Sequence, residues 1–212
     1  MAKIGTNLKS RVAVIGATGR AGGRIIEELL ARGHSVTAIA RGAASLEARP
    51  GLTPCAIDAR DSDALARAIE GHDAVISAAR FSDLSAVAVI AAVQRAAVAR
   101  VLVVGGAASL RTADGMRLFD SPTFPEAYRA EAGAGIAFLE ALQAERSLDW
   151  TFLSPAALFD GQQRTAKFRL GLDNLLIDAQ GVSQVSFPDY AIAMVDELEA
   201  PAHRRQRFHV AY

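Results

Sequence analysis

A glycine-rich turn near the start of the chain restricts the fold more than any other feature. The apolar residues 12–15 (VAVI) precede the segment GATGRAG at residues 16–22, and an amphipathic stretch follows. A strand, a tight turn and a helix start in this order form a cradle for the diphosphate of a dinucleotide, because backbone N–H groups at the helix start bind anions. The alternative is a glycine-rich turn between a strand and a helix that binds nothing.

Each glycine in this segment has its own expected role. Gly16 allows a sharp turn at the strand end, where a positive φ is expected. Gly19 lacks a Cβ, so N–H groups can approach a pyrophosphate closely, and Gly22 allows the helix to pack against the strand. We therefore assign the phosphate-binding part of a cofactor site to Gly16, Thr18, Gly19, Arg20, Ala21 and Gly22.

Strand-like and helix-like segments alternate along most of the chain. The strand-like segments are continuous apolar runs, as expected when helices cover both faces of a sheet. This alternation predicts an α/β fold with a doubly wound parallel sheet. The expected strands are residues 11–15, 35–40, 52–57, 73–77, 101–104 and 150–153, the third of them near an edge because it contains Pro54. The expected helices are residues 20–32, 62–69 (capped by Asp61 or Ser62), 84–99 and 126–146.

The pattern changes after residue 153. We interpret residues 155–187 as a small substrate-side segment joined to the same sheet, so that residues 1–212 form a single domain. The elements expected beyond residue 153 are short strands at 167–170, 175–178 and 182–186, a helix at 189–199 and a last strand at 207–210.

Composition gives no sign of binding to nucleic acid or a membrane, and the partner we expect is a small-molecule substrate. The 23 basic and 23 acidic residues balance, so neither nucleic acid nor an anionic membrane is an expected partner. No apolar segment is long enough for a signal peptide or a bilayer span. The single cysteine, Cys55, cannot form an internal disulfide, and we expect it to be a small buried residue. We predict a cytoplasmic monomer or homodimer without a metal site, because cysteines and histidines lack metal-ligand spacing.

The end of the second expected strand favours NADP(H) over NAD(H). An NAD site usually carries an acid there to bind the ribose 2′-OH, but this strand ends at Arg41 with no acid before Glu47. A guanidinium pairs with a 2′-phosphate, and Arg20 can close on the same phosphate. The alternative for Arg41 is a solvated loop side chain.

Residues after the third and fourth strands complete the expected cofactor contacts. Asp58 is placed to reach the adenine edge, and capping of a helix is the alternative role. Ser77, Ala78 and Ala79 would pass beside the cofactor ribose, where small side chains permit close approach. Small residues of this kind are equally common in ordinary cores.

None of the four histidines is expected to be catalytic. His34 and His72 each follow a helix-ending glycine and precede a strand, which places them at the amino ends of strands, opposite the cofactor. His203 and His209 belong to a basic C-terminal stretch, most simply a solvated face and a final strand. Without a histidine at the cofactor edge, a Ser-His-Asp triad is excluded.

Several segments together carry a family resemblance. GATGRAG at 16–22, GHSVTAIAR at 33–41 and GHDAVISAA at 71–79 resemble the atypical short-chain dehydrogenases with an NmrA-like, NAD(P)-binding Rossmann fold. VVGGAASL at 103–110, LDWTFLSP at 148–155 and HRRQRF at 203–208 look like members described as NADH-flavin reductases, which are similar to biliverdin/flavin reductases. The resemblance implies further cofactor contacts at Gly105, Gly106, Ser154 and Pro155.

The sequence departs from this family at the catalytic pair. Short-chain dehydrogenases that reduce carbonyls use a tyrosine and a lysine four residues later, which lowers the pKa of the tyrosine. The comparable tyrosine here is Tyr128, and Ala132 occupies the lysine position. We therefore discount alcohol or ketone chemistry. Tyr128 keeps two interpretations, a residue lining the pocket or a residue of the helix surface.

Hydride transfer to a flavin does not need this pair, because the protein has mainly to align two rings. FMN or FAD as substrate, a quinone or a linear tetrapyrrole meets this condition. The expected acceptor pocket is lined by Gly106, Ser109, Ser154 and Phe159. Ser109 is expected to donate a hydrogen bond to the acceptor, or else to form a turn. The alternative function is a non-catalytic NADP(H)-binding sensor of NmrA-like type.

Overall fold

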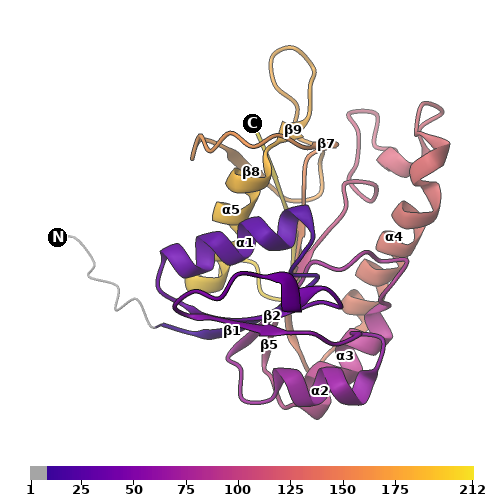
Figure 1. Ribbon diagram of the computed structural model, residues 1–212. Coiled ribbons are helices and arrows are strands. Elements are labelled where there is room, and N and C mark those ends of the chain that lie inside the picture. Colours follow the sequence, from indigo (N-terminus) through magenta and orange to yellow (C-terminus); the bar gives the residue numbers. More distant parts are fainter. Residues whose placement is uncertain (1–8) are drawn as a thin grey trace.

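An eight-stranded sheet runs through the computed structural model, which describes residues 9–212 (Figure 1). Its strands are β1 (Arg11–Ile15), β2 (Ser35–Ile39), β3 (Leu52–Cys55), β4 (Ala74–Ser77), β5 (Arg100–Val104), β6 (Asp149–Ser154), β8 (Arg169–Gly171) and β10 (Gln206–Ala211). Their spatial order is β3-β2-β1-β4-β5-β6-β10-β8. All neighbours are parallel except β10 and β8. The predicted doubly wound α/β fold is confirmed.

Helices cover both faces of the sheet. One face carries α1 (Arg20–Ala31) and α5 (Phe187–Glu199), which pack against each other (Figure 1). The other face carries α2 (Ser62–Ile69), α3 (Ala86–Arg95) and α4 (Arg129–Ala144). Among the helices within residues 9–212, none is long and apolar enough to cross a membrane.

Each face of the sheet has its own apolar core, and β1 contributes to both. Val12 and Val14 pack with α1 and α5, whereas Ala13 and Ile15 pack on the opposite face. Side chains alternate between faces along a strand, so a strand covered on both sides must be apolar at every position. All four side chains are almost fully buried. The continuous apolar run in the sequence is the direct result.

The first part of the chain follows the predicted elements closely. β3 lies at one edge of the sheet and, among the described strands, pairs only with β2. Pro54 is tolerated there because the outer side of an edge strand needs no N–H donor. Asp61 is the N-cap of α2, and its side chain accepts from the N–H groups of Asp63 and Ala64 at 3.0 Å each. α4 starts later than expected, after the 3₁₀ turn Glu126–Tyr128.

The strand expected at residues 175–178 is wrong. The N–H of Leu176 donates to Nε2 of His209 at 3.1 Å rather than to a neighbouring strand, so this segment stays irregular. A separate two-stranded parallel sheet forms instead from β7 (Leu158–Phe159) and β9 (Gln184–Val185). Leu176 packs against the apolar core, whereas Ile177 is exposed. Apolar content alone does not distinguish such packing from strand pairing.

The stretch 163–166 is fastened to the start of α5. The buried carboxylate of Asp189 accepts hydrogen bonds from the N–H groups of Thr165 (2.9 Å) and Ala166 (2.8 Å) and from the hydroxyl of Tyr212 (2.8 Å). Ser186 Oγ donates to the carbonyl of Gln163 at 2.6 Å. Side chains rather than strand pairing therefore hold this part of the substrate-side segment.

Candidate dinucleotide site

The turn after β1 accepts only glycine at two positions. Gly16 has φ +81°, as expected, and a Cβ added there would lie 2.6 Å from the carbonyl carbon of Ala78. A Cβ on Gly22 would lie 2.3 Å from the carbonyl oxygen of Gly16. At Gly16 the loop after β4 lies against the turn, and at Gly22 the start of α1 lies against the same turn. The turn, the loop and the helix start thus form one compact unit.

The N-terminus of α1 carries free backbone donors. Its N-cap is Gly19, which has no side chain to cap the helix, whereas Asp61, Ser85 and Ser186 cap α2, α3 and α5. Within residues 9–212, the N–H groups at positions 20–22 have no acceptor, and the first helical bond runs from Gly23 N to the carbonyl of Gly19 at 2.9 Å. These donors, with the positive end of the helix dipole, fit the diphosphate of a dinucleotide.

A cavity of about 370 Å³ opens beside this helix start, at the carboxyl ends of β1 to β4. Its volume lies in the range of small-molecule sites. Seven of the residues predicted to contact the cofactor line it together: Gly16, Thr18, Gly19, Arg41, Asp58, Ala78 and Ala79. Arg60, Arg80 and Asp83 also line it.

Arg41 and Asp58 both line this cavity, but only Asp58 is paired with another side chain among the described residues. Arg41 is exposed and makes no hydrogen bond or ion pair within the described part of the chain. Asp58 is bound by Arg60, whose Nη2 lies 2.6 Å from Oδ2. The hydrogen bonds from Arg60 lower the pKa of Asp58 to about 2. Asp58 does not cap a helix, since Asp61 does, so its carboxylate is fixed as an anion paired with Arg60.

Other predicted cofactor residues lie around the cavity rather than on its wall. Arg20 is exposed, and its guanidinium stacks over the ring of Phe187 at 5.0 Å. Ala21 and Gly22 offer only backbone donors. Ser77 is buried at the end of β4. Each is one residue or one turn from a residue that lines the cavity, so the cluster predicted around the glycine turn is compact.

Of the predicted contacts after β5 and β6, Gly105, Ser154 and Pro155 are tightly packed, whereas Gly106 has ordinary contacts. A Cβ on Gly105 would lie 2.4 Å from the ring of Phe152, and one on Gly106 would lie 3.9 Å from the ring of Phe81. Ser154 and Pro155 are buried, and Ser154 Oγ has no hydrogen-bond partner within residues 9–212. None of these four residues lines the cavity at the glycine turn.

Ser109 is held by an arginine from the last strand. Arg207 Nη1 donates to Ser109 Oγ at 3.2 Å, and the same guanidinium binds the carboxylate of Asp173. Because the hydroxyl oxygen accepts this bond, the Ser109 proton is left to donate elsewhere. No motif in the sequence indicates this partner, because Arg207 lies 98 residues from Ser109 along the chain.

Tyr128 stands at the N-terminus of α4 with 65% of its surface exposed. Its side chain makes no capping hydrogen bond. The carboxylate that contacts the cofactor-side loop from this helix is Glu131, which accepts from the N–H of Phe81 at 2.7 Å and of Ser82 at 3.1 Å. Sequence reasoning missed Glu131, because an acid in a first helical turn is ordinarily explained by the helix dipole. It also missed Arg60, which a short Asp-x-Arg turn could have suggested.

The histidines have structural partners, and none of them lines the cavity at the glycine turn. At the amino ends of the strands, His34 accepts from Ser10 N at 3.1 Å and His72 contacts Thr37 Oγ1 at 2.8 Å. His209 lies in the last strand, as expected, and is fully buried. Its Nδ1 donates to the carbonyl of Ser154 at 3.0 Å, and burial lowers its pKa. Among the described residues, no group of acids, cysteines or histidines forms a metal site.

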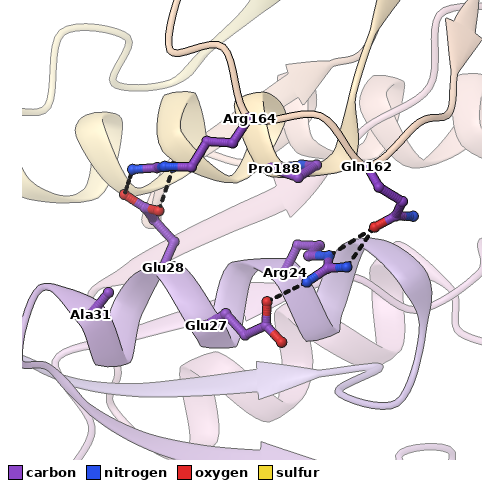
Figure 2. Close-up of a pocket in the computed structure, with 7 residues that line it drawn as sticks. All are labelled: Arg24, Glu27, Glu28, Ala31, Gln162, Arg164 and Pro188. Carbon is purple, nitrogen blue, oxygen red and sulfur yellow. Dashed lines mark hydrogen bonds and ion pairs between the residues drawn. The ribbon is translucent and has the colours of Figure 1, made fainter.

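A second cavity, of about 330 Å³, lies between α1 and the substrate-side segment (Figure 2). Arg24 binds Glu27 at 2.6 Å and Gln162 at 2.6 Å, and Arg164 binds Glu28 at 2.8 Å. These charged side chains satisfy one another across the gap. The cavity is therefore a gap between two packed elements that ion pairs bridge. None of the predicted site residues lines it.

The strand order, the uncapped helix start and the cavity at the carboxyl ends define a dinucleotide-binding protein with a Rossmann fold. The sequence model of the NAD(P)H-binding family matches residues 16–201. The chain therefore belongs to this family, in agreement with its resemblance to the atypical short-chain dehydrogenases.

Three relatives span nearly the whole chain. The uncharacterized protein YwnB of Bacillus subtilis is 40% identical over 211 residues, covering 94% of this chain and 97% of YwnB. The structure of a "putative epimerase" from Bacteroides thetaiotaomicron is 37% identical with a TM-score of 0.91, covering 96% and 97% of the two chains. That of a "putative NADH-flavin reductase" from Streptococcus pneumoniae is 35% identical with a TM-score of 0.83, covering 95% and 99%. The two names point to different reactions.

Proposed function

We propose that this protein is an NADPH-dependent reductase that transfers hydride to a flavin or a similar conjugated acceptor. The observation that carries the proposal is the free N-terminus of α1 beside the exposed Arg41, combined with Ala132 in place of a catalytic lysine. The first two features favour binding of a phosphorylated dinucleotide. The third favours an acceptor that needs no protein proton donor.

The preference for NADPH over NADH depends on Arg41. It follows β2 directly, it lines the cavity, and no acid stands before Glu47 to repel a 2′-phosphate. Of the two acids that line the cavity within the described chain, Asp58 and Asp83, Asp58 is paired with Arg60. A free guanidinium forms strong, charge-assisted hydrogen bonds with a phosphate.

The chain's own groups then have mainly to position the reactants. The dinucleotide supplies a hydride from its reduced nicotinamide. The N–H groups at positions 20–22 hold its diphosphate, and the loop at Ala78 and Ala79 lies against the turn at Gly16. Ser109, oriented by Arg207, donates its hydroxyl proton as a hydrogen bond toward a carbonyl of the acceptor. A flavin takes its remaining proton from water, which makes a Tyr-Lys pair unnecessary.

A turnover assay tests the proposal. NADPH oxidation is followed by absorbance with FMN, riboflavin, a quinone or biliverdin as acceptor, with NADH in parallel. We expect oxidation with at least one acceptor and a higher kcat/KM for NADPH than for NADH. The name of the S. pneumoniae relative supports flavin as the first acceptor to try.

The second candidate function is an NADP(H) sensor without turnover. The exposure of Tyr128 and the absence of a lysine at position 132 favour it, because the usual proton relay of the family is missing. Tight binding of NADPH without oxidation by any of these acceptors would support the sensor and contradict the reductase.

A further inference from the structure

The loop at residues 78–84 forms one wall of the cavity at the glycine turn. Its contribution to the lining consists of Ala78, Ala79, Arg80, Asp83 and Leu84. A flexible loop that becomes ordered only when the ligand binds lowers the affinity, because ordering the loop costs free energy. Contacts that hold the loop in place before binding avoid this cost.

The beginning of this loop is fixed by the sheet. The N–H of Ala78 donates to the carbonyl of Ile15 at 2.8 Å, and its backbone lies against Gly16. Asp83 N and Leu84 N both donate to the carbonyl of Arg80 at 3.1 Å, which closes a turn in the second half. The peptide groups between these two fixed points need a partner from elsewhere.

Glu131 of α4 supplies that partner. Its Oε1 accepts from Phe81 N at 2.7 Å and its Oε2 accepts from Ser82 N at 3.1 Å, while Arg80 Nε lies 3.7 Å from Oε2. Hydrogen bonds to an ionised acceptor are stronger than neutral ones. Glu131 lies in the first turn of α4, where the helix dipole also favours a carboxylate.

Further residues of α4 that face the sheet contact the ring of Phe81. Gly135, four residues after Glu131, has no Cβ, and one added there would lie 2.9 Å from the ring. Phe138 lies 5.2 Å and Phe152 6.0 Å from the ring centroid. The side chain of Phe81 is thus seated between α4 and the sheet, and its backbone is tied to Glu131.

We propose that Glu131 is a positioning residue for dinucleotide binding, which holds residues 80–82 in place as a preformed wall of the cavity. It acts through backbone N–H groups and through the placement of Arg80, whose side chain is otherwise 72% exposed. The inference rests on the dinucleotide site of the proposed function and not on the identity of the acceptor.

Direct binding measurements test this role. The Kd for NADPH is measured by calorimetry for Glu131→Ala and Glu131→Gln, with Glu140→Ala as a matched control on an exposed position of the same helix. We expect Glu131→Ala to raise the Kd about tenfold and Glu131→Gln, which keeps one acceptor oxygen, about threefold. Glu140→Ala should stay within about twofold. Unchanged affinity in a folded Glu131→Ala protein would overturn the proposal.

Hydrogen exchange tests it without ligand and without turnover. In the wild-type protein free of ligand, the amides of Phe81 and Ser82 should be protected, and in Glu131→Gln they alone should exchange about tenfold faster. Fast exchange of these two amides in the wild-type protein would contradict a preformed wall. A role in overall stability alone would instead accelerate exchange throughout the sheet. A protein that binds NADPH in this manner but reduces no acceptor would refute the reductase and leave Glu131 as a positioning residue.

Discussion

At the amino ends of the strands, charged side chains are buried and paired with one another, whereas at the carboxyl ends a guanidinium stands free beside a cavity. Arg100 at the start of β5 binds Glu197 at 3.0 Å and Asp149 at 3.1 Å. Arg41, after the end of β2, makes no hydrogen bond or ion pair within residues 9–212. Paired charges hold the ends of elements together, and an unpaired cation is available to an anionic ligand.

The amino-end network centres on the buried carboxylate of Glu197. Glu197, which is 4% exposed, also accepts from His203 N at 2.9 Å and from His203 Nδ1 at 2.8 Å. Burial lowers the pKa of Arg100, and the attraction of Glu197 opposes this shift. One buried carboxylate thus joins β5, β6, α5 and the segment before β10. The unpaired guanidinium of Arg41 lies at the opposite edge of the sheet, where we propose the cofactor site.

The largest effect should come from the glycine turn. Gly22→Ala places a Cβ 2.3 Å from the Gly16 oxygen, so we expect loss of NADPH affinity by at least about a hundredfold, or a comparable loss of stability. The matched control is Gly23→Ala, whose Cβ would lie 3.9 Å from the nearest atom and which should stabilise α1 by about 0.5–1 kcal/mol. Calorimetry and chemical denaturation measure both. Equal behaviour of the two variants would refute the role of Gly22.

A variant at the opposite end of the sheet should affect stability alone. Glu197→Ala leaves the buried Arg100 without its main partner, which is expected to cost about 3–5 kcal/mol of unfolding free energy. The Kd for NADPH should change by less than about twofold in the protein that remains folded. A parallel loss of affinity, measured by fluorescence titration, would break the division of the molecule into a structural and a functional end.

Arg41→Ala should change cofactor selectivity. Removing a charge-assisted contact with the 2′-phosphate is expected to cost about 1.5–3 kcal/mol, so the Kd for NADPH should rise about tenfold or more while that for NADH is nearly constant. Arg49→Ala is the control, since Arg49 is also an exposed loop arginine but does not line the cavity. An equal effect on both dinucleotides would remove the assignment of Arg41.

The smallest effect concerns the pH dependence of stability. Burial lowers the pKa of His209 below its ordinary value of 6.5, so the unfolded chain takes up this proton at a higher pH than the folded protein does. The contribution to stability is complete above pH 6.5 and is lost as the pH falls toward the folded pKa. His209→Gln should flatten the unfolding free energy between pH 6.5 and 5.5 relative to the wild type. Chemical denaturation at a series of pH values measures this slope, and an unchanged slope in His209→Gln would contradict the prediction.

Much of the site near the glycine turn was predictable, because its residues lie in that turn or directly after a strand. The phosphate cradle needs a strand, a glycine turn and a helix start within residues 11–22, and neighbouring parallel strands end at the same edge of a sheet. Gly16, Arg41, Asp58 and Ala78 meet for this reason. The substrate-side segment was predicted less well, because side chains such as Asp189 and His209 replace ladder hydrogen bonds there.

The sequence by itself determined the sheet, the order of its elements and the edge that carries the glycine turn, because apolar periodicity and glycine positions are local signals. Only the tertiary structure decided which side chains support that edge. Glu131 meets Phe81 across 50 residues and Arg207 meets Ser109 across 98. Such contacts depend on how helices and loops pack over the sheet, and no local pattern in the sequence records the distance between residues so far apart.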